Sequence, residues 1–253
     1  MSELDGVGDA APDLVARVRA LVVAVLVSLS GLAVGLAVVL GLGAVVLGAG
    51  VQPTPLATLA VSLVAIQGVA FGGVALAYLR YRGWGRAALG VRVPGVRELL
   101  VVVAGYALAL TAAVVAAVVI SVTGLPVGEN QVADVGRADP TAFLWLIPAS
   151  FLLIGPGEEL LFRGVVQGRI RETFGPVAGV ALASAVFAAV HYVALTGGAG
   201  GRLVTISVLF LPSLVFGAAY ELTDNLVVPA LVHGAYNATL FGLAYVAFRM
   251  MGT

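Results

Sequence analysis

The sequence predicts an all-α, polytopic transmembrane helix bundle with an intramembrane site, and three observations lead to that prediction. The 253-residue chain is 61% hydrophobic and 10% charged, with a mean hydropathy of +1.11. Several apolar runs exceed the roughly 18 residues that indicate a membrane-spanning helix. A few ionisable side chains lie inside such runs, where hydrocarbon makes them costly. An ordinary soluble domain does not combine these features.

Charge and cysteine content narrow the function classes. The 13 acidic and 13 basic residues give a formal net charge of zero, so we expect no nucleic-acid partner. The absence of cysteine excludes disulfides, thiolate metal sites and cysteine lipidation. Residues 1–13 carry four acidic side chains and no basic one, which is not the pattern of a cleavable signal peptide.

The apolar runs predict seven helices. Their expected ranges are 20–49, 55–79, 98–123, 141–168, 176–196, 203–222 and 226–249. The first range is longer than the roughly 20 residues that a span needs, and a re-entrant turn near Gly41 and Gly43 would raise the count to eight. We expect a solvated tail over 1–19 and a single transmembrane domain over 20–253.

Arginines cluster in alternate connections between the predicted helices. Arg17 and Arg19 precede the first helix, five arginines lie within 80–97, and Arg169 and Arg171 follow the fourth helix. The third connection instead contains more acidic residues than arginines. Because arginine and lysine favour the cytoplasmic side, we expect a multi-pass protein of the cell membrane with a cytoplasmic N-terminus.

The polar side chains within the spans concentrate in the last four helices. They are Glu158, Glu159, Arg163, His191, His233 and Asn237. Both histidines of the chain are therefore intramembrane. At about 1.5 Å of rise per residue, the members of the fourth, fifth and seventh helices fall at similar depth. This coincidence predicts one polar site shared by three helices.

Helical spacing separates the two neighbouring carboxylates. Glu159 and Arg163 are four positions apart, share a helix face and are expected to pair. Glu158 has no such local partner. The Gly-Pro-Gly tripeptide at 155–157 is expected to loosen or kink the helix beside it. In the second helix, Gln67 is expected to hydrogen-bond to another helix.

These residue types suit the hydrolysis of a peptide bond without a nucleophilic serine or cysteine. A glutamate and a histidine beside a water molecule form a general-base arrangement. A second histidine with an asparagine can donate hydrogen bonds to an oxyanion. Two histidines and a glutamate are also a ligand set of catalytic zinc, here Glu158, His191 and His233. The H-E-x-x-H pattern of soluble zinc proteases is absent, so that alternative depends on composition alone.

Three motifs occur in order along the chain. They are Glu158-Glu159-x-x-x-Arg163, Phe187-x-x-x-His191 and His233-x-x-x-Asn237. Over about residues 140–240 this arrangement resembles the CPBP (CaaX protease and bacteriocin-processing, or Abi) family of intramembrane proteases, which includes the type II CaaX prenyl endopeptidases. The motif-bearing helices, at about 140–249, would then be the catalytic ones.

The resemblance implies a role for each motif residue. Glu158 and His191 would activate water. His233 and Asn237 would stabilise the oxyanion. The supporting residues would be Glu159, Arg163 and Phe187. The family has been described both as metalloproteases and as glutamate proteases. We favour a site without a cofactor, because His233 and Asn237 suit an oxyanion hole better than a zinc shell, and we keep zinc as the alternative.

The resemblance leaves the substrate open. Eukaryotic members of the family cut after a prenylated cysteine near a C-terminus. The expected partners are therefore the lipid bilayer and a membrane-associated peptide or protein. This substrate would be prenylated if the processing is of the CaaX type. A proton-coupled transporter is the first alternative, because intramembrane Glu and His also serve as proton relays. Inverted repeats would favour a transporter, and the sequence has none that we can identify. A non-catalytic immunity or scaffold protein with the same fold is the second.

Overall fold

A computed structural model describes residues 14–250 and Gly252. Its helical elements are α1 (Leu14–Gly48), α2 (Pro55–Leu63), η1 (Val64–Phe71), α3 (Gly72–Arg82), η2 (Arg86–Leu89), α4 (Val96–Thr123), α5 (Val132–Ala138), α6 (Ala142–Ala149), η3 (Ser150–Ile154), α7 (Gly155–Glu159), η4 (Leu160–Gln167), α8 (Gly168–Val190), η5 (His191–Ala194), α9 (Ala199–Thr223) and α10 (Val227–Met250). The two strands, β1 (Glu129–Asn130) and β2 (Leu195–Thr196), pair antiparallel.

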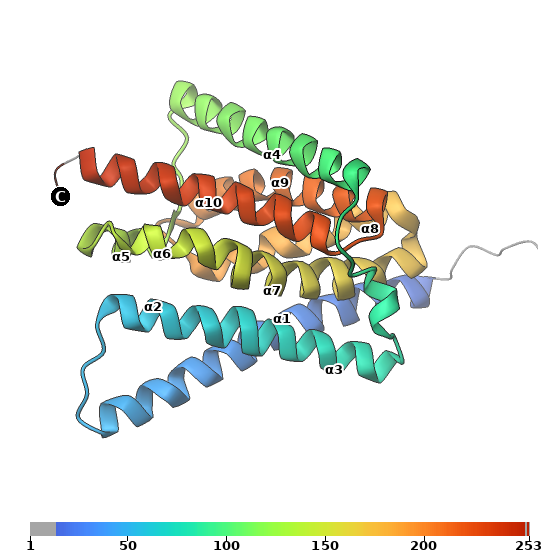
Figure 1. Ribbon diagram of the computed structural model, residues 1–253, viewed down its shortest axis with the longest axis horizontal. Coiled ribbons are helices and arrows are strands. Elements are labelled where there is room, and N and C mark those ends of the chain that lie inside the picture. The colour runs from blue at the N-terminus through green and yellow to red at the C-terminus, as the bar shows by residue number, and fades with distance from the viewer. Residues whose placement is uncertain (1–13, 251, 253) are drawn as a thin grey trace, which may run out of the picture.

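Within the described residues, six helical stretches are long and apolar enough to cross a membrane. They are Leu14–Gly48, Pro55–Arg82, Val96–Thr123, Ala142–Ala194, Ala199–Thr223 and Val227–Met250. The fourth stretch is interrupted at Gly175, whose φ of 78° and ψ of 176° are not helical, and the chain reverses there (Figure 1). This stretch therefore makes two passes, and the described residues form seven passes in all. The predicted all-α transmembrane bundle is confirmed.

The first helix, α1, lacks the turn that was predicted within it. α1 runs without interruption to Gly48, so the re-entrant turn predicted near Gly41 and Gly43 is wrong, and with it the count of eight. A backbone turn inside hydrocarbon would leave amide groups unpaired, which costs more than the low helix propensity of glycine. α1 also begins at Leu14 instead of residue 20, and residues 1–13 of the predicted tail lie outside the described residues.

The second pass is a continuous helix with a π-helical middle. Thr54 caps its start by accepting a hydrogen bond from the Ala57 amide at 3.2 Å, and Pro55 occupies the first turn. Gly83, with a φ of 67°, ends it. The π-helical segment η1 carries Gln67. Such segments change the direction in which the following side chains point and are frequent at functional sites.

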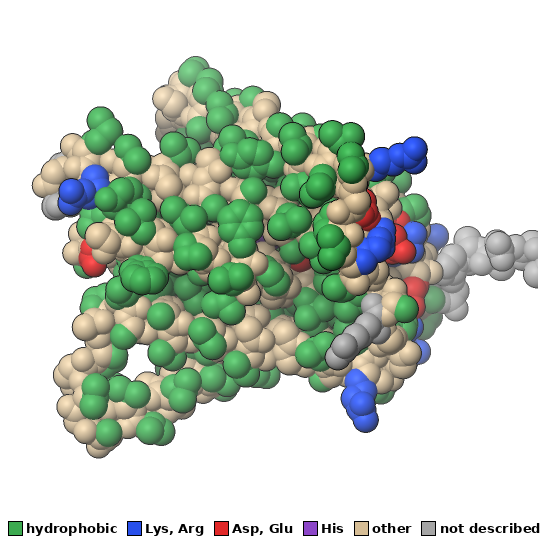
Figure 2. Space-filling view, viewed as in Figure 1, with side chains coloured by type: hydrophobic (Ala, Val, Ile, Leu, Met, Phe, Trp, Pro, Cys, Tyr) green, Lys and Arg blue, Asp and Glu red, His purple; other side chains and the backbone are tan. Residues whose placement is uncertain are grey.

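The fourth pass forms the centre of the bundle. Leu161, Phe162, Val165, Val166 and Ile170 are at most 1% exposed and pack in the main apolar core. In Figure 1 this pass lies between the pair formed by α1 and α2–α3 and the helices α4, α9 and α10. Hydrophobic side chains are spread over the visible face between the two ends, and the charged ones gather mainly at those ends (Figure 2). A bilayer would therefore meet an apolar belt.

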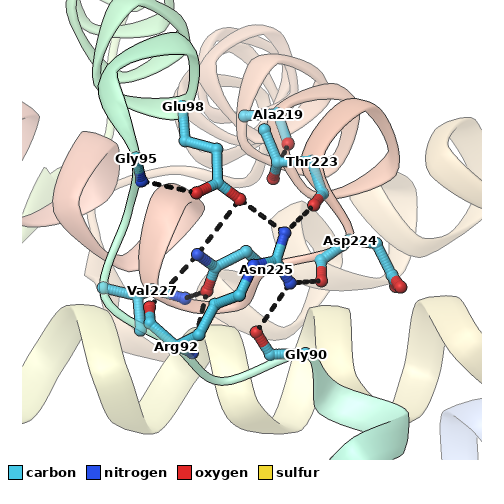
Figure 3. Close-up of polar contacts among 9 residues, drawn as sticks. All are labelled: Gly90, Arg92, Gly95, Glu98, Ala219, Thr223, Asp224, Asn225 and Val227. Carbon is cyan, nitrogen blue, oxygen red and sulfur yellow. Dashed lines mark hydrogen bonds and ion pairs between the residues drawn. The ribbon is translucent and has the colours of Figure 1, made fainter.

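A polar clamp fixes the start of α10 (Figure 3). Asn225 is fully buried in the turn before α10, and its Oδ1 accepts hydrogen bonds from the amides of Val227 (3.2 Å) and Arg92 (3.4 Å). Its Nδ2 donates to the carbonyl of Arg92 at 3.2 Å and to Glu98 in α4 at 3.3 Å. The α9–α10 turn is thereby bonded to the segment that precedes α4.

The guanidinium of Arg92 completes this clamp. It donates to the carbonyls of Thr223 and Asp224, each at 2.8 Å, and pairs with Glu98 at 2.6 Å. Gly90 permits the close approach, since a Cβ there would lie 1.8 Å from the Asp224 carbonyl oxygen. The clamp sets the position of α10, which carries two of the predicted site residues.

Candidate active site

Three of the predicted residues converge in the middle of the bundle. Glu158 lies in α7, His191 begins η5 at the end of α8, and His233 lies in α10. Oε2 of Glu158 is 3.9 Å from Nε2 of His191 and 3.7 Å from Nε2 of His233. Glu158 and His233 are 4% and 3% exposed, whereas the His191 side chain is 23% exposed. The structure thus brings these residues together, with His191 on the more accessible side.

The glycines at 155 and 157 make this convergence possible. A Cβ on Gly155 would lie 2.8 Å from the carbonyl oxygen of Ala230 in α10, and one on Gly157 would lie 2.3 Å from that of Gln67. The helix continues through the Gly-Pro-Gly tripeptide instead of breaking there, with the π-helical η3 before α7 and η4 after it. The tripeptide therefore lets two other helices approach the backbone beside Glu158.

The two oxygens of Glu158 have different surroundings. Oε1 accepts a hydrogen bond from Nε2 of Gln67 at 2.7 Å. Oε2 is buried and accepts no hydrogen bond from the described residues, although both imidazoles face it. The sequence indicated that Gln67 bonds across helices but gave no reason to join it to Glu158. The available signal was a carboxamide inside an otherwise apolar helix.

Glu159 connects a structural ion pair to the second histidine. Its Oε2 is 2.9 Å from Nε of Arg163, as the spacing predicts, and both side chains are fully buried. Its Oε1 lies 2.8 Å from Nδ1 of His233, a contact that the sequence did not predict. Arg163 also donates to Oγ of Ser213 in α9 at 3.1 Å. Glu159 therefore orients His233 while its charge is balanced by Arg163.

Phe187 supports the site with both its backbone and its ring. Its carbonyl oxygen lies 2.8 Å from Nδ1 of His191. Because a carbonyl can only accept, Nδ1 carries a hydrogen, and in a neutral ring Nε2 would then keep its lone pair toward Glu158. The Phe187 ring lies 4.5 Å from the His191 ring and 5.9 Å from that of His233. Phe216 stacks on His233 at 4.6 Å and 16°, and as an ordinary apolar residue it gave no signal in the sequence.

Asn237 is the predicted residue that the structure does not connect to the others. It lies in α10 one turn beyond His233 and is partly buried. Its carboxamide makes no hydrogen bond to another described residue. Its place on the His233 side of α10 follows from helical spacing alone.

The polar cluster contains residue types that bind metal ions. Two imidazole nitrogens and a carboxylate oxygen are chemically suited to zinc. In the part of the chain that the structure describes, however, no three His, Asp or Glu side chains are grouped so that they could hold a metal ion. The mechanism that we propose uses side chains and water, and zinc bound by Glu158, His191 and His233 stays the alternative.

The fold and the cluster define a multi-pass membrane protein with carboxylate and imidazole groups buried at its centre. Residues 140–239 match the model of the family described as type II CAAX prenyl endopeptidase, Rce1-like. This segment contains all three motifs, so the resemblance to the CaaX protease-like family is confirmed over it. No curated protein and no solved structure gives a significant match. The first three passes, with Gln67, lie outside the matched segment.

Proposed function

We propose that this protein is an intramembrane endopeptidase in which Glu158 and His191 activate a water molecule. The observation that carries the proposal is the 3.9 Å separation of Glu158 Oε2 and His191 Nε2. A carboxylate oxygen and the unprotonated nitrogen of a neutral imidazole are both acceptors, so they cannot bond to each other. A water molecule has two O–H donors and suits both. Its oxygen then points away from them, toward a substrate carbonyl.

The remaining groups suit the later steps. As the water oxygen attacks the carbonyl carbon, its proton passes to Glu158, and negative charge develops on the carbonyl oxygen. The proposal requires His233 to donate from Nε2 to this oxyanion, together with the Asn237 carboxamide. For this the His233 ring must carry hydrogens on both nitrogens, with the Glu159 carboxylate at Nδ1 balancing the charge. The C–N bond then breaks, and the amine leaves with the proton from Glu158.

For the substrate we propose a membrane-associated peptide processed near its C-terminus, prenylated as in CaaX-type processing. The family description supports this class. We further propose that the N-terminus and the arginine-rich end of the bundle face the cytoplasm of a cell membrane and that the substrate arrives from that side. The alternation of arginines between connections supports this orientation.

The direct test is cleavage by the purified full-length protein in liposomes. A farnesylated peptide with a CaaX C-terminus and the same peptide without the lipid are incubated in H2¹⁸O, and products are identified by mass spectrometry. We expect one cut in the farnesylated peptide, with one ¹⁸O in the new carboxyl group. If neither peptide is cut and the protein dissipates an imposed pH gradient, the transporter alternative is favoured.

Metal removal gives a separate prediction. Because the mechanism uses only side chains and water, prolonged treatment with EDTA should leave the cleavage rate unchanged, and purified active protein should contain no stoichiometric zinc. Elemental analysis and the liposome assay measure both quantities. Loss of activity with EDTA that zinc restores would instead assign Glu158, His191 and His233 as metal ligands.

A further inference from the structure

Gln67 touches the site from outside the segment that matches the protease family. It lies in η1, in the second pass, whereas the matched residues are 140–239. Its Nε2 donates a 2.7 Å hydrogen bond to Oε1 of Glu158. Its own Oε1 is buried and accepts no hydrogen bond from the described residues. The first three passes therefore do more than surround the matched helices, because one of them contacts the proposed base.

We propose that Gln67 is a positioning residue of the hydrolytic site, an inference that rests on the proposed function. A glutamate side chain has three rotatable bonds and two equivalent carboxylate oxygens. The hydrogen bond from Gln67 occupies Oε1, so Oε2 is the oxygen left to face His191 and His233. Gln67 thereby determines which oxygen takes the proton from water, and from which direction. Misplacing a catalytic group by about 1 Å can reduce the rate by about 100-fold.

Two features of the backbone hold Gln67 in this place. The π-helical turns of η1 set the direction of its side chain. Gly157 lets α7 approach so closely that a Cβ there would lie 2.3 Å from the Gln67 carbonyl oxygen. Since Gly157 immediately precedes Glu158, this contact fixes the two backbones relative to each other beside the hydrogen bond. Donor and acceptor are thus positioned by packing and not by the side chains alone.

A second buried glutamine provides a matched control. Gln167 is 1% exposed, and its Nε2 donates to the carbonyl of Gly217 at 3.1 Å and to Glu221 at 3.3 Å. It lies at the end of η4 and makes no hydrogen bond to Glu158 or to either histidine within the described residues. Gln167→Met therefore removes a buried carboxamide from the same bundle without removing a contact to the site.

The test compares Gln67→Met with Gln167→Met in the liposome cleavage assay. Methionine keeps the unbranched shape and cannot donate a hydrogen bond. We expect Gln67→Met to lower kcat by about 100-fold with KM unchanged, because the contact positions the base and not the substrate. Gln167→Met should keep the wild-type kcat even if its melting temperature falls. A Gln67→Met variant with wild-type kcat, or equal kcat losses in both variants, would overturn the positioning role.

A thermal double-mutant cycle tests the contact without any activity. Melting temperatures are measured in detergent for Gln67→Met, Glu158→Met and the double variant. We expect the double variant to lose less than the sum of the two single losses, because each single change already breaks the hydrogen bond. Additive losses would overturn the proposal. If the wild type cuts no peptide, the proposed function and the role of Gln67 are both overturned. If the wild type cuts the peptide and Gln67→Met cuts it equally fast, only the role of Gln67 is overturned.

Discussion

Replacing Glu158 with glutamine should reduce the cleavage rate severely and leave the folded yield close to wild type. A carboxamide has nearly the same shape but cannot take a proton from water, and general-base catalysis contributes about 10²- to 10⁴-fold. The new side chain can still accept the hydrogen bond from Gln67 through its oxygen. Removing a charge that is 4% exposed also removes a desolvation penalty. Cleavage rate and yield of monodisperse protein in detergent measure the two effects.

Glu172→Gln is the matched control for this prediction. Glu172 lies at the charged end of the bundle, 36% exposed at its side chain, and pairs with Arg82 and Arg169 at 2.8 Å each. The same change of chemistry there should leave the cleavage rate unaltered. If Glu158→Gln cuts at the wild-type rate, Glu158 is not the base, whatever the folded yield.

Arg163→Ala should strongly reduce the folded yield. The guanidinium is fully buried, 2.9 Å from Glu159, and lies over the Phe187 ring at 5.2 Å. Its removal leaves the Glu159 carboxylate buried with only the His233 imidazole beside it, and breaking a buried pair in this way costs about 3–5 kcal/mol. That is a large fraction of the stability of a typical domain. The measurement is the melting temperature and the monodisperse yield in detergent.

Two further variants test whether the loss of folded yield comes from an unpaired buried charge or from the loss of any arginine side chain. Arg171→Ala breaks an ion pair with Glu221 in which the arginine side chain is 57% exposed, and it should cost about 0–1 kcal/mol. The double variant Arg163→Met/Glu159→Gln removes both buried charges and should recover part of the yield lost in Arg163→Ala. If Arg163→Ala is benign and Glu158→Gln misfolds, the roles assigned to the two carboxylates are reversed.

Sequence reasoning succeeded where a property is local to one helix. Apolar runs of sufficient length predict spans because hydrocarbon admits little else. The pairing of Glu159 with Arg163 follows from one helical turn. The fourth helix was predicted to end at residue 168, with Arg169 and Arg171 in the connection that follows it. The structure keeps these residues helical, since exposed charges at the end of a bundle do not prevent a helix from continuing.

Contacts between helices could not be predicted in the same way. The hydrogen bond of Gln67 to Glu158 depends on a π-helical segment and on a glycine in the facing helix, and neither has a periodic signature. The contact of Glu159 with His233 and the stacking of Phe216 depend on how α9 and α10 pack. Similar depth in the bilayer predicted that Glu158, His191, His233 and Asn237 would meet, and the structure brings the first three together. It could not predict which atoms would face one another.

The central claim is that Glu158 and His191 act together on one water molecule. The most direct measurement is single-turnover cleavage of the farnesylated peptide by wild type, Glu158→Gln, His191→Ala and the double variant. Groups that act as a unit have strongly non-additive effects. The double variant should therefore be no slower than the slower of the two single variants. A double variant whose loss equals the product of the two single losses would show that the residues act independently and would contradict a shared site.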